Sequence, residues 1–155
     1  MTKECKQQFT LRISQANSTQ MIVILYEMLL CYLDEAENAK DDTELRDALR
    51  KARGCVNELM NSLHLEYAPA PNMMQLYLYC IRRLAHYERK QEKESLEDIR
   101  NVIRPLHDAY QEIEKLNDKG PVMNNSQTVY AGLTYGKNTL TENMADQGSN
   151  RGMLA

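Results

Sequence analysis

Apolar residues recur at helical spacing along the first three quarters of the chain, which shows no two-residue alternation typical of a half-buried strand. This pattern predicts four helices, over about residues 18–39, 43–65, 73–90 and 95–117. The fourth is the most regular, because its apolar residues from Leu96 to Ile113 lie three and four positions apart in turn, as in the seam of a bundle. With short connections between the segments, the pattern predicts an all-α fold, an antiparallel up-down four-helix bundle.

The predicted helices begin at residues suited to capping. Asn17 or Ser18 is expected to cap the first helix, with Gln20 placed to complete a capping box behind Asn17. Two prolines in YAPAPN separate the second helix from the third, which Asn72 can cap, and Ser95 opens the fourth.

Pro105 interrupts the fourth predicted helix. A proline inside a helix removes the hydrogen bond to the residue four positions earlier, so we expect a kink in the axis. The alternative is a pair of shorter helices that meet at this residue.

The stretch MIVILYEMLLCYL, residues 21–33, is apolar on two sides rather than one. Twelve of its thirteen residues are apolar, and only Glu27 carries a charge. One set suits the bundle core: Ile22, Leu25, Leu29, Tyr32, Leu33 and, just beyond the stretch, Ala36. A second set, which we name the outer stripe, consists of Met21, Ile24, Met28 and Cys31. The run is too short to span a bilayer, which takes roughly 20 apolar residues. Because a soluble monomer seldom leaves a large apolar patch exposed, we expect the outer stripe to be covered.

Three covers are open for the outer stripe: the protein's own termini, a second copy of the chain, or a different protein. A further interpretation is that the bundle hides both sets by itself, because a wide apolar face is normal for a central helix. The nine methionines fit either an adaptable binding surface or simple filling of the core.

The distribution of glycine divides the chain into a helical body and a polar tail. Gly54 is the single glycine before Lys119, and the other five come after it. We therefore expect an N-terminal segment over residues 1–16, a bundle domain over 17–117, and a polar, glycine-rich tail over 118–155 that is mostly disordered or loosely docked.

Composition narrows the choice of partner and compartment. The formal net charge of −3 argues against a nucleic-acid partner, which a basic protein face would bind. The first residues, MTKECKQQFT, lack the apolar region of a secretion signal, and the four cysteines show no CxxC spacing. We expect reduced thiols, a cytoplasmic location and no insertion into a membrane.

The sequence offers little for catalysis or for a metal. His64, His86 and His107 form neither an HxxxH pair nor the ExxH pattern of di-iron bundles, and phosphate-binding or nucleophile motifs are missing. His107 and Asp108 are interpreted as surface residues that point to different sides of their helix. The expectation is a protein that is not an enzyme and takes no cofactor or metal.

Four segments of the body share their pattern with one known family. ANSTQMIVILYEMLLCYLDEA matches that family's first helix through Ala16 and the LYE of residues 25–27, and VNELMNSLHLE matches the end of the second. QLYLYCIRRLAHYERK carries a signature of the type LYxYxxRRL through Tyr77, Tyr79, Arg82 and Arg83, and LEDIRNVIRPLHDAYQEI is similar to the fourth helix. Over about residues 13–117 the chain thus resembles the FliS-type flagellar secretion chaperones, although Ser18 and Met28 replace the family's usual Pro and Gly.

The resemblance implies a cytoplasmic, non-catalytic chaperone that binds the C-terminal segment of newly made flagellin. Such a chaperone prevents self-assembly of the cargo and keeps it competent for flagellar type III secretion. The partner of the export apparatus is then the complex of chaperone and cargo. In the family, cargo lays helical pieces into hydrophobic grooves, and the chaperone's N-terminal segment can cover a groove when cargo is absent. The residues expected to contact flagellin are Met21, Ile24, Met28, Cys31, Tyr77, Leu78, Ile81 and Arg82.

Three further expectations accompany this hypothesis. At least one of Arg82 and Arg83 is expected to pair with carboxylates of the bundle. The tail segment TVYAGLTYGKNTL is apolar enough to occupy the protein's own groove, in which case deleting residues 120–155 tightens flagellin binding, or to bind an accessory protein. The alternative function is a structural homo-oligomer whose outer stripe closes a dimer. For the chaperone itself, a second copy of the chain is the partner expected without cargo, in a weak homodimer.

Overall fold

The computed structural model describes residues 1–64 and 69–116, and within these ranges every regular element is a helix. The five helices are α1 (Lys3–Gln15), α2 (Ser18–Glu37), α3 (Asp42–Asn61), α4 (Ala70–Lys90) and α5 (Lys93–Leu116). The all-α prediction is confirmed for the described ranges, but the predicted number of four helices is wrong, because α1 precedes the four that the pattern indicates. The predicted tail over 118–155, including TVYAGLTYGKNTL, lies outside the described residues.

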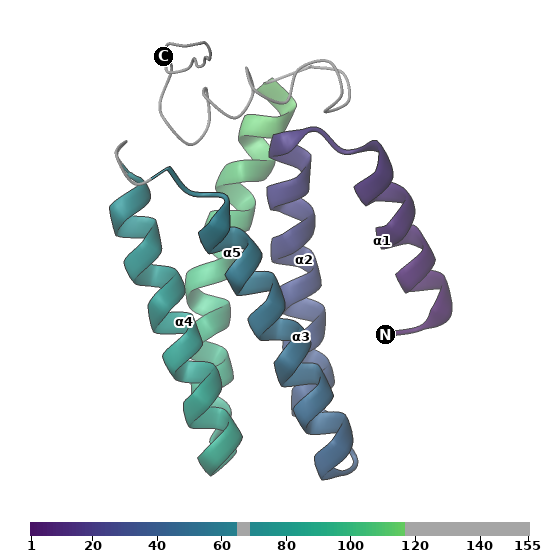
Figure 1. Ribbon diagram of the computed structural model, residues 1–155, viewed down its shortest axis with the longest axis vertical. Coiled ribbons are helices and arrows are strands. Elements are labelled where there is room, and N and C mark those ends of the chain that lie inside the picture. The colour runs from purple at the N-terminus through teal and green to yellow at the C-terminus, as the bar shows by residue number, and fades with distance from the viewer. Residues whose placement is uncertain (65–68, 117–155) are drawn as a thin grey trace.

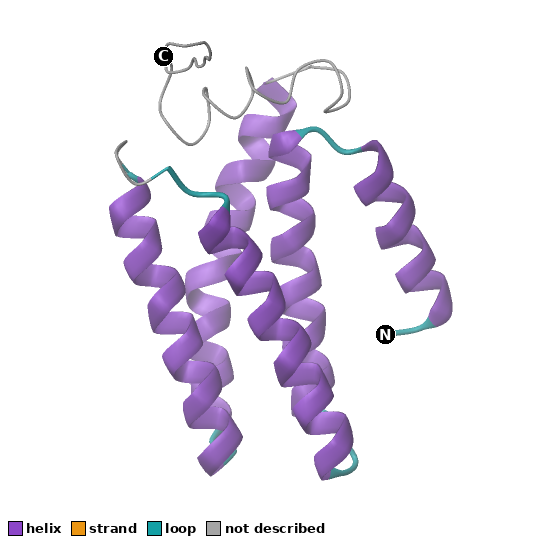
Figure 2. Cartoon of the chain, viewed as in Figure 1, coloured by secondary structure: helices purple, strands orange, loops and turns teal. Residues whose placement is uncertain are grey.

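Helices α2 to α5 pack around a common core, and α1 lies on the outside of α2 (Figure 1). Both α2 and α4 pack against α3 and α5, so α2 and α4 occupy diagonal corners of the bundle. Short connections join α1 to α2, α2 to α3 and α4 to α5, and each of these pairs runs antiparallel (Figure 2). Over the ranges that are described, no helix has an apolar stretch of the length that crossing a membrane requires.

The predicted cap of α2 is confirmed. The side-chain oxygen of Asn17 accepts a hydrogen bond from the Gln20 backbone N–H at 2.8 Å, and the Gln20 side-chain oxygen accepts one from the Asn17 backbone N–H at 3.0 Å. This capping box satisfies two N–H groups that the first turn of a helix leaves unpaired.

Two other predicted caps are wrong. The helix α4 begins at Ala70, before Asn72, because the first turn tolerates Pro71, which has no N–H to leave unpaired there. The helix α5 begins at Lys93, and the buried hydroxyl of Ser95 accepts a hydrogen bond from Arg83 at 3.0 Å instead of capping the helix.

The helix α5 is continuous through Pro105, so the alternative of two shorter helices is wrong. Pro105 is exposed, as is Asn101, whose carbonyl group loses its partner because proline has no N–H. Water can solvate that carbonyl group at the surface, which lowers the cost of a proline inside this helix. The kink in the axis stays a prediction.

The core contains a buried pair of tyrosine hydroxyls. The largest fully buried side chains are Tyr26, Tyr77, Ile24, Leu29, Leu33, Leu49, Leu59, Leu84, Leu96, Ile99 and Ile103. The hydroxyl oxygens of Tyr26 and Tyr77 lie 2.6 Å apart, and the Tyr26 ring packs edge-on against Tyr110 with 5.8 Å between centroids. Burial raises the pKa of both Tyr26 and Tyr77, so both hydroxyls stay neutral and must satisfy one another.

Candidate functional site

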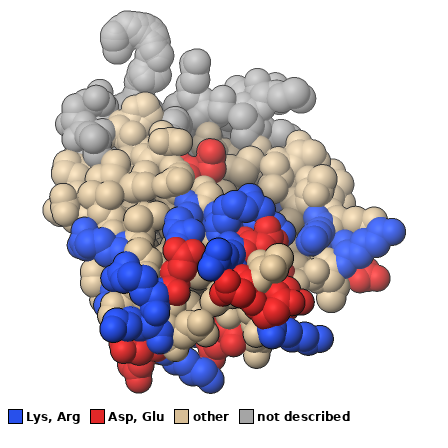
Figure 3. All heavy atoms as spheres, turned by 60° about the horizontal axis from the view of Figure 1, so that its bottom comes forward, with Lys and Arg blue, Asp and Glu red and all other residues tan. Residues whose placement is uncertain are grey.

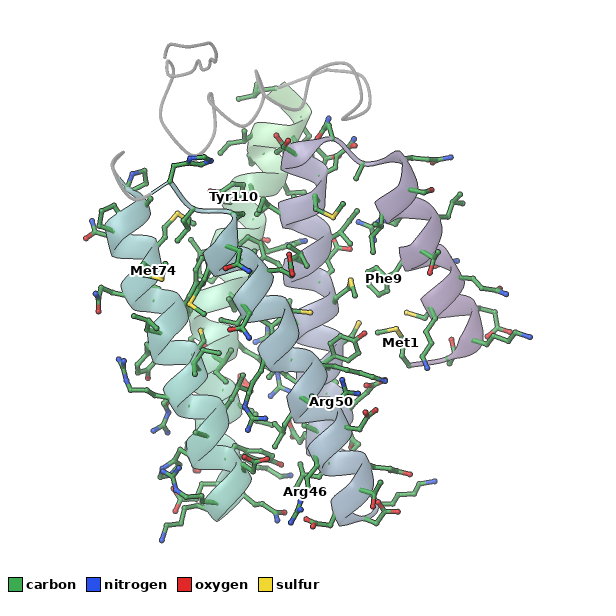
Figure 4. The ribbon with its side chains drawn as sticks, in the orientation of Figure 1. Met1, Phe9, Arg46, Arg50, Met74 and Tyr110 are labelled. Atoms are coloured by element: carbon green, nitrogen blue, oxygen red, sulfur yellow. The ribbon has the colours of Figure 1, made fainter. Side chains whose placement is uncertain are left out.

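The helix α1 covers the outer stripe of α2. Phe9 points from α1 toward α2 (Figure 4), is 8% exposed, and forms a small cluster with Ala16 and Ile24. The partly buried side chains around this cluster are Met1 and Cys5 from the N-terminal segment and Met21, Met28 and Cys31 from α2. Of the three covers that the sequence leaves open, the structure therefore shows the protein's own N-terminal helix.

The attachment of α1 is slight compared with that of the other helices. Phe9 is the single buried residue among the 13 of α1, whereas α2 buries eight of its 20. Leu11, on the same helix, is 57% exposed. Burying one Phe side chain is worth about 1.5–3 kcal/mol, while a whole domain is stable by about 5–15 kcal/mol. The helix α1 can therefore detach while the bundle of α2 to α5 stays folded.

Polar contacts at two levels hold α1 in place. The guanidinium of Arg12 pairs with Glu27 of α2 at 2.6 Å, and about two turns further along α2 the N-terminal amino group of Met1 pairs with Glu35. Burial alone would raise the pKa of Glu27, but hydrogen bonds from Arg12 and His107 outweigh it and lower the pKa below its usual value. Glu27 is therefore charged at neutral pH and can hold α1 electrostatically.

His107 also takes part in this arrangement, which corrects the interpretation of this residue as a surface group. Its Nε2 lies 2.9 Å from Glu27 Oε2, its Nδ1 lies 3.3 Å from Asp108, and the side chain is largely buried. His107 thus connects α5 to the same carboxylate that binds Arg12, because α5 is a neighbour of α2 in the bundle.

The cover leaves space near the connection between α1 and α2. A cavity of about 200 Å³ is lined by Arg12, Gln15, Gln20, Val23, Ile24 and Glu114. Gln20 donates a hydrogen bond across this region to Glu114 of α5 at 3.3 Å. Part of the outer stripe, at Ile24, therefore borders a cavity as well as Phe9.

The remaining predicted contact residues lie on α4 and do not meet the outer stripe. Leu78 is 36% exposed, Ile81 is partly buried against the core, and Arg82 is exposed. Since α4 is diagonal to α2, the structure separates these residues from the outer stripe; Met74 on α4 and Phe9 on α1 lie on opposite sides of the bundle (Figure 4). We name Leu78, Ile81 and Arg82 the α4 face.

Tyr77 belongs to the core rather than to a surface. Its side chain is 1% exposed and its hydroxyl contacts that of Tyr26, so in this conformation it offers no contact area to a partner. The two arginines of the same signature also differ from each other in their contacts. Arg83 pairs with Asp98 at 3.1 Å, which confirms the structural role expected for at least one arginine, whereas Arg82 makes no ion pair within residues 1–64 and 69–116.

On the end of the bundle that Figure 3 presents, Lys and Arg are mixed with Asp and Glu, and neither charge forms a separate patch. Among the described residues, no three His, Cys, Asp or Glu side chains are grouped to hold a metal ion. The four cysteines are free thiols, and burial raises the pKa of both Cys55 and Cys80 to about 12.

The chain matches a known protein family. A family model described as "Flagellar protein FliS" matches residues 1–117, a range that includes α1 as well as the whole bundle. No curated protein matches the chain.

Proposed function

The chain belongs to the FliS family of flagellar proteins, and from this premise we propose that it is an export chaperone for flagellin. The family supports a flagellar chaperone role in general, and the proposal specifies the cargo. The protein binds the C-terminal segment of newly made flagellin in the cytoplasm, prevents premature polymerisation and keeps the cargo competent for flagellar type III secretion. The export apparatus then meets the cargo as a complex with the chaperone.

The observation that carries the proposal is the outer stripe beneath a weakly attached helix. Helical partners that dock in a groove contact apolar residues at steps of three and four, and the outer stripe has steps of three, four and three. A flagellin helix that displaces α1 would bury the same side chains that Phe9 now covers. The helix α1, a segment of the same chain, already occupies this surface. This supports a helix with apolar side chains as the ligand.

The α4 face is the second contact in the proposal. Leu78, Ile81 and Arg82 are too far around the bundle for one helix to touch them and the outer stripe together, because α2 and α4 are diagonal. A cargo that is disordered before binding can reach both, since such segments wrap large surfaces as they fold.

Cargo binding has a free-energy cost, because α1 must first leave the outer stripe. If α1 is docked by about 2 kcal/mol, only about 3% of molecules have the outer stripe open, and the apparent affinity falls about thirtyfold. The cost keeps the apolar stripe covered in molecules without cargo, since a large exposed apolar patch favours aggregation.

The experiment that tests the proposal is calorimetric titration of the full chain with the C-terminal ~40 residues of the same organism's flagellin, followed by hydrogen exchange. Coupled folding is expected to give a large negative heat-capacity change, and the amides of α1 should exchange faster in the complex. Absence of binding would contradict the proposed function. Binding with unchanged protection of α1 would place the cargo elsewhere.

Matched variants distinguish the outer stripe from its surroundings. Met28→Glu puts a charge into the stripe and should weaken peptide binding at least tenfold, because a buried unpaired carboxylate is costly. Leu11→Glu, on the exposed side of α1, is the control and should bind as the unmodified chain does.

The structural homo-oligomer is not favoured, because α1 of the same chain covers the stripe that would close a dimer. Sedimentation with and without the flagellin peptide tests it. A dimer that persists in the presence of peptide would support the homo-oligomer instead of the chaperone.

A further inference from the structure

Cys5 and Cys31 lie on the two sides of the contact between α1 and α2. Both pack around the cluster of Phe9 and Ile24, and both line one shallow cavity of about 410 Å³ together with Glu35. The two thiols come from segments that are joined only through the turn at residues 16–17.

The register of the two helices places these thiols opposite one another. The amino group of Met1 pairs with Glu35, Cys5 follows Met1 by four residues, and Cys31 precedes Glu35 by four residues. Cys5 lies in the first turn of α1, and Cys31 lies about one turn before Glu35 on α2, so both thiols come close to this ion pair. The Cys5 side chain is near enough to Cys31 to form a hydrogen bond with it, which places the two thiols against one another.

The other two cysteines are unsuited to exchange with reagents. Cys55 and Cys80 are buried in the core of the bundle, and burial raises the pKa of both thiols to about 12, so little thiolate forms near neutral pH. Burial also raises the pKa of Cys31, and the neighbouring Cys5 raises it further. Cys5 and Cys31 are both partly accessible.

We propose that Cys5 and Cys31 are a modification site, a reversible disulfide that locks α1 over the outer stripe. The consequence for cargo rests on the function proposed above, whereas the bond itself does not. A closed bond would tie α1 to α2 covalently, so that α1 could no longer leave the stripe to a competing helix. Disulfides in a reducing compartment are transient, and this one would act as a sensor of oxidising conditions.

The oxidant is a small-molecule disulfide such as oxidised glutathione. The thiolate of one of the two cysteines attacks one sulfur of the reagent, the other sulfur leaves as a glutathione thiolate, and a mixed disulfide forms. The thiolate of the other cysteine then attacks the cysteine sulfur of this mixed disulfide and displaces the second glutathione. Two cysteine thiols together lose two electrons and two protons, and the reagent becomes two molecules of glutathione.

The first experiment maps the bond in the full chain. The protein is incubated with oxidised glutathione, free thiols are alkylated, and the digest is analysed by mass spectrometry. The expected product is a cross-linked pair of peptides containing Cys5 and Cys31, with Cys55 and Cys80 alkylated only after unfolding. Cys5→Ser should abolish the cross-link, and a dominant bond between any other two cysteines, or none, would overturn the proposal.

The second experiment measures what the bond does. In the oxidised chain, amide exchange in α1 should slow, and the ~40-residue flagellin peptide should bind at least tenfold more weakly until dithiothreitol restores it. Cys5→Ser should show the same affinity before and after treatment with oxidant. Equal binding by the reduced and cross-linked chains would overturn the lock. Failure of the reduced chain to bind would instead contradict the proposed function, and the mapping would still decide whether the site exists.

Discussion

At the scale of single residues, Glu27 decides how α1 is attached. It is the one charged residue in an otherwise apolar run, and in the sequence it resembles an interruption of that run. In the structure its two carboxylate oxygens contact Arg12 of α1 and His107 of α5. The carboxylate therefore connects three helices, an arrangement that no local pattern indicates because Arg12 and His107 are 95 positions apart in the chain.

This arrangement predicts a pH dependence. Because the pKa of Glu27 is lowered in the folded chain, the stability that it contributes is present above the unfolded value of about 4.3 and is lost as the pH falls through the folded pKa. Thermal unfolding between pH 7 and pH 3 should show a loss that Glu27→Gln lacks, with a difference at pH 7 of about 0.5–1 kcal/mol, since the pair is partly exposed. Identical pH profiles for the two proteins would show that the ion pair contributes nothing.

The tyrosine pair gives a second prediction at this scale. Tyr26→Phe or Tyr77→Phe alone leaves one buried hydroxyl without its partner and should lower the free energy of unfolding by about 1–2 kcal/mol. The double variant removes both hydroxyls and should cost less than the sum of the two single changes. Urea unfolding measures all three, with Tyr79→Phe, which is partly exposed, as the control. Additive losses would mean that the two hydroxyls do not depend on one another.

At the scale of the helices, α1 is the element that the hydrophobic pattern does not reveal. Its contacts come from Met1, Cys5 and Phe9, which are spaced by four residues, and Thr2 caps it by accepting a hydrogen bond from the Cys5 N–H at 3.1 Å. This spacing is a helical signal, but a stripe of three residues is narrower than the face of an ordinary packed helix. The tertiary contact with α2 therefore stabilises a helix whose own apolar pattern is too narrow to predict it.

Removing this element gives the third prediction. A chain without residues 1–16 should keep its helical circular dichroism, because the core of α2 to α5 does not depend on α1. The exposed outer stripe should increase binding of an apolar fluorescent dye and promote self-association. Phe9→Ala, which removes the single buried side chain of α1, should give an intermediate effect. Unchanged dye binding in the truncated chain would mean that another segment covers the stripe.

At the scale of the whole molecule, the diagonal placement of α2 and α4 separates two groups of residues that the sequence predicts to contact flagellin. Helical spacing reports the angle of a side chain about its own axis, but not which helix lies beside it. The proposed cargo has therefore to reach around the bundle.

Because the outer stripe and the α4 face are separate, mutations in the two surfaces should have additive effects on the binding free energy. Met28→Ala and Leu78→Ala should each weaken binding of the flagellin peptide, and the changes in binding free energy should add to within about 0.3–0.5 kcal/mol, as they do for distant sites. The pair of Met28→Ala with Phe9→Ala is the comparison, because both residues belong to one cluster and should be coupled. Strong coupling between Met28 and Leu78 would mean that a single groove forms when cargo binds.

The sequence by itself determined the helical class, the start of α2 and most core positions, because these depend on spacing along one helix and on capping by nearby residues. Leu49, Val56 and Ile103 are examples of fully buried core residues that the spacing alone identifies. Only the tertiary structure decided that Tyr26 pairs with Tyr77, that α1 covers the outer stripe, and that the α4 face lies on another side. Each of these depends on which helices become neighbours, a property of the packing of the whole chain that no single segment carries.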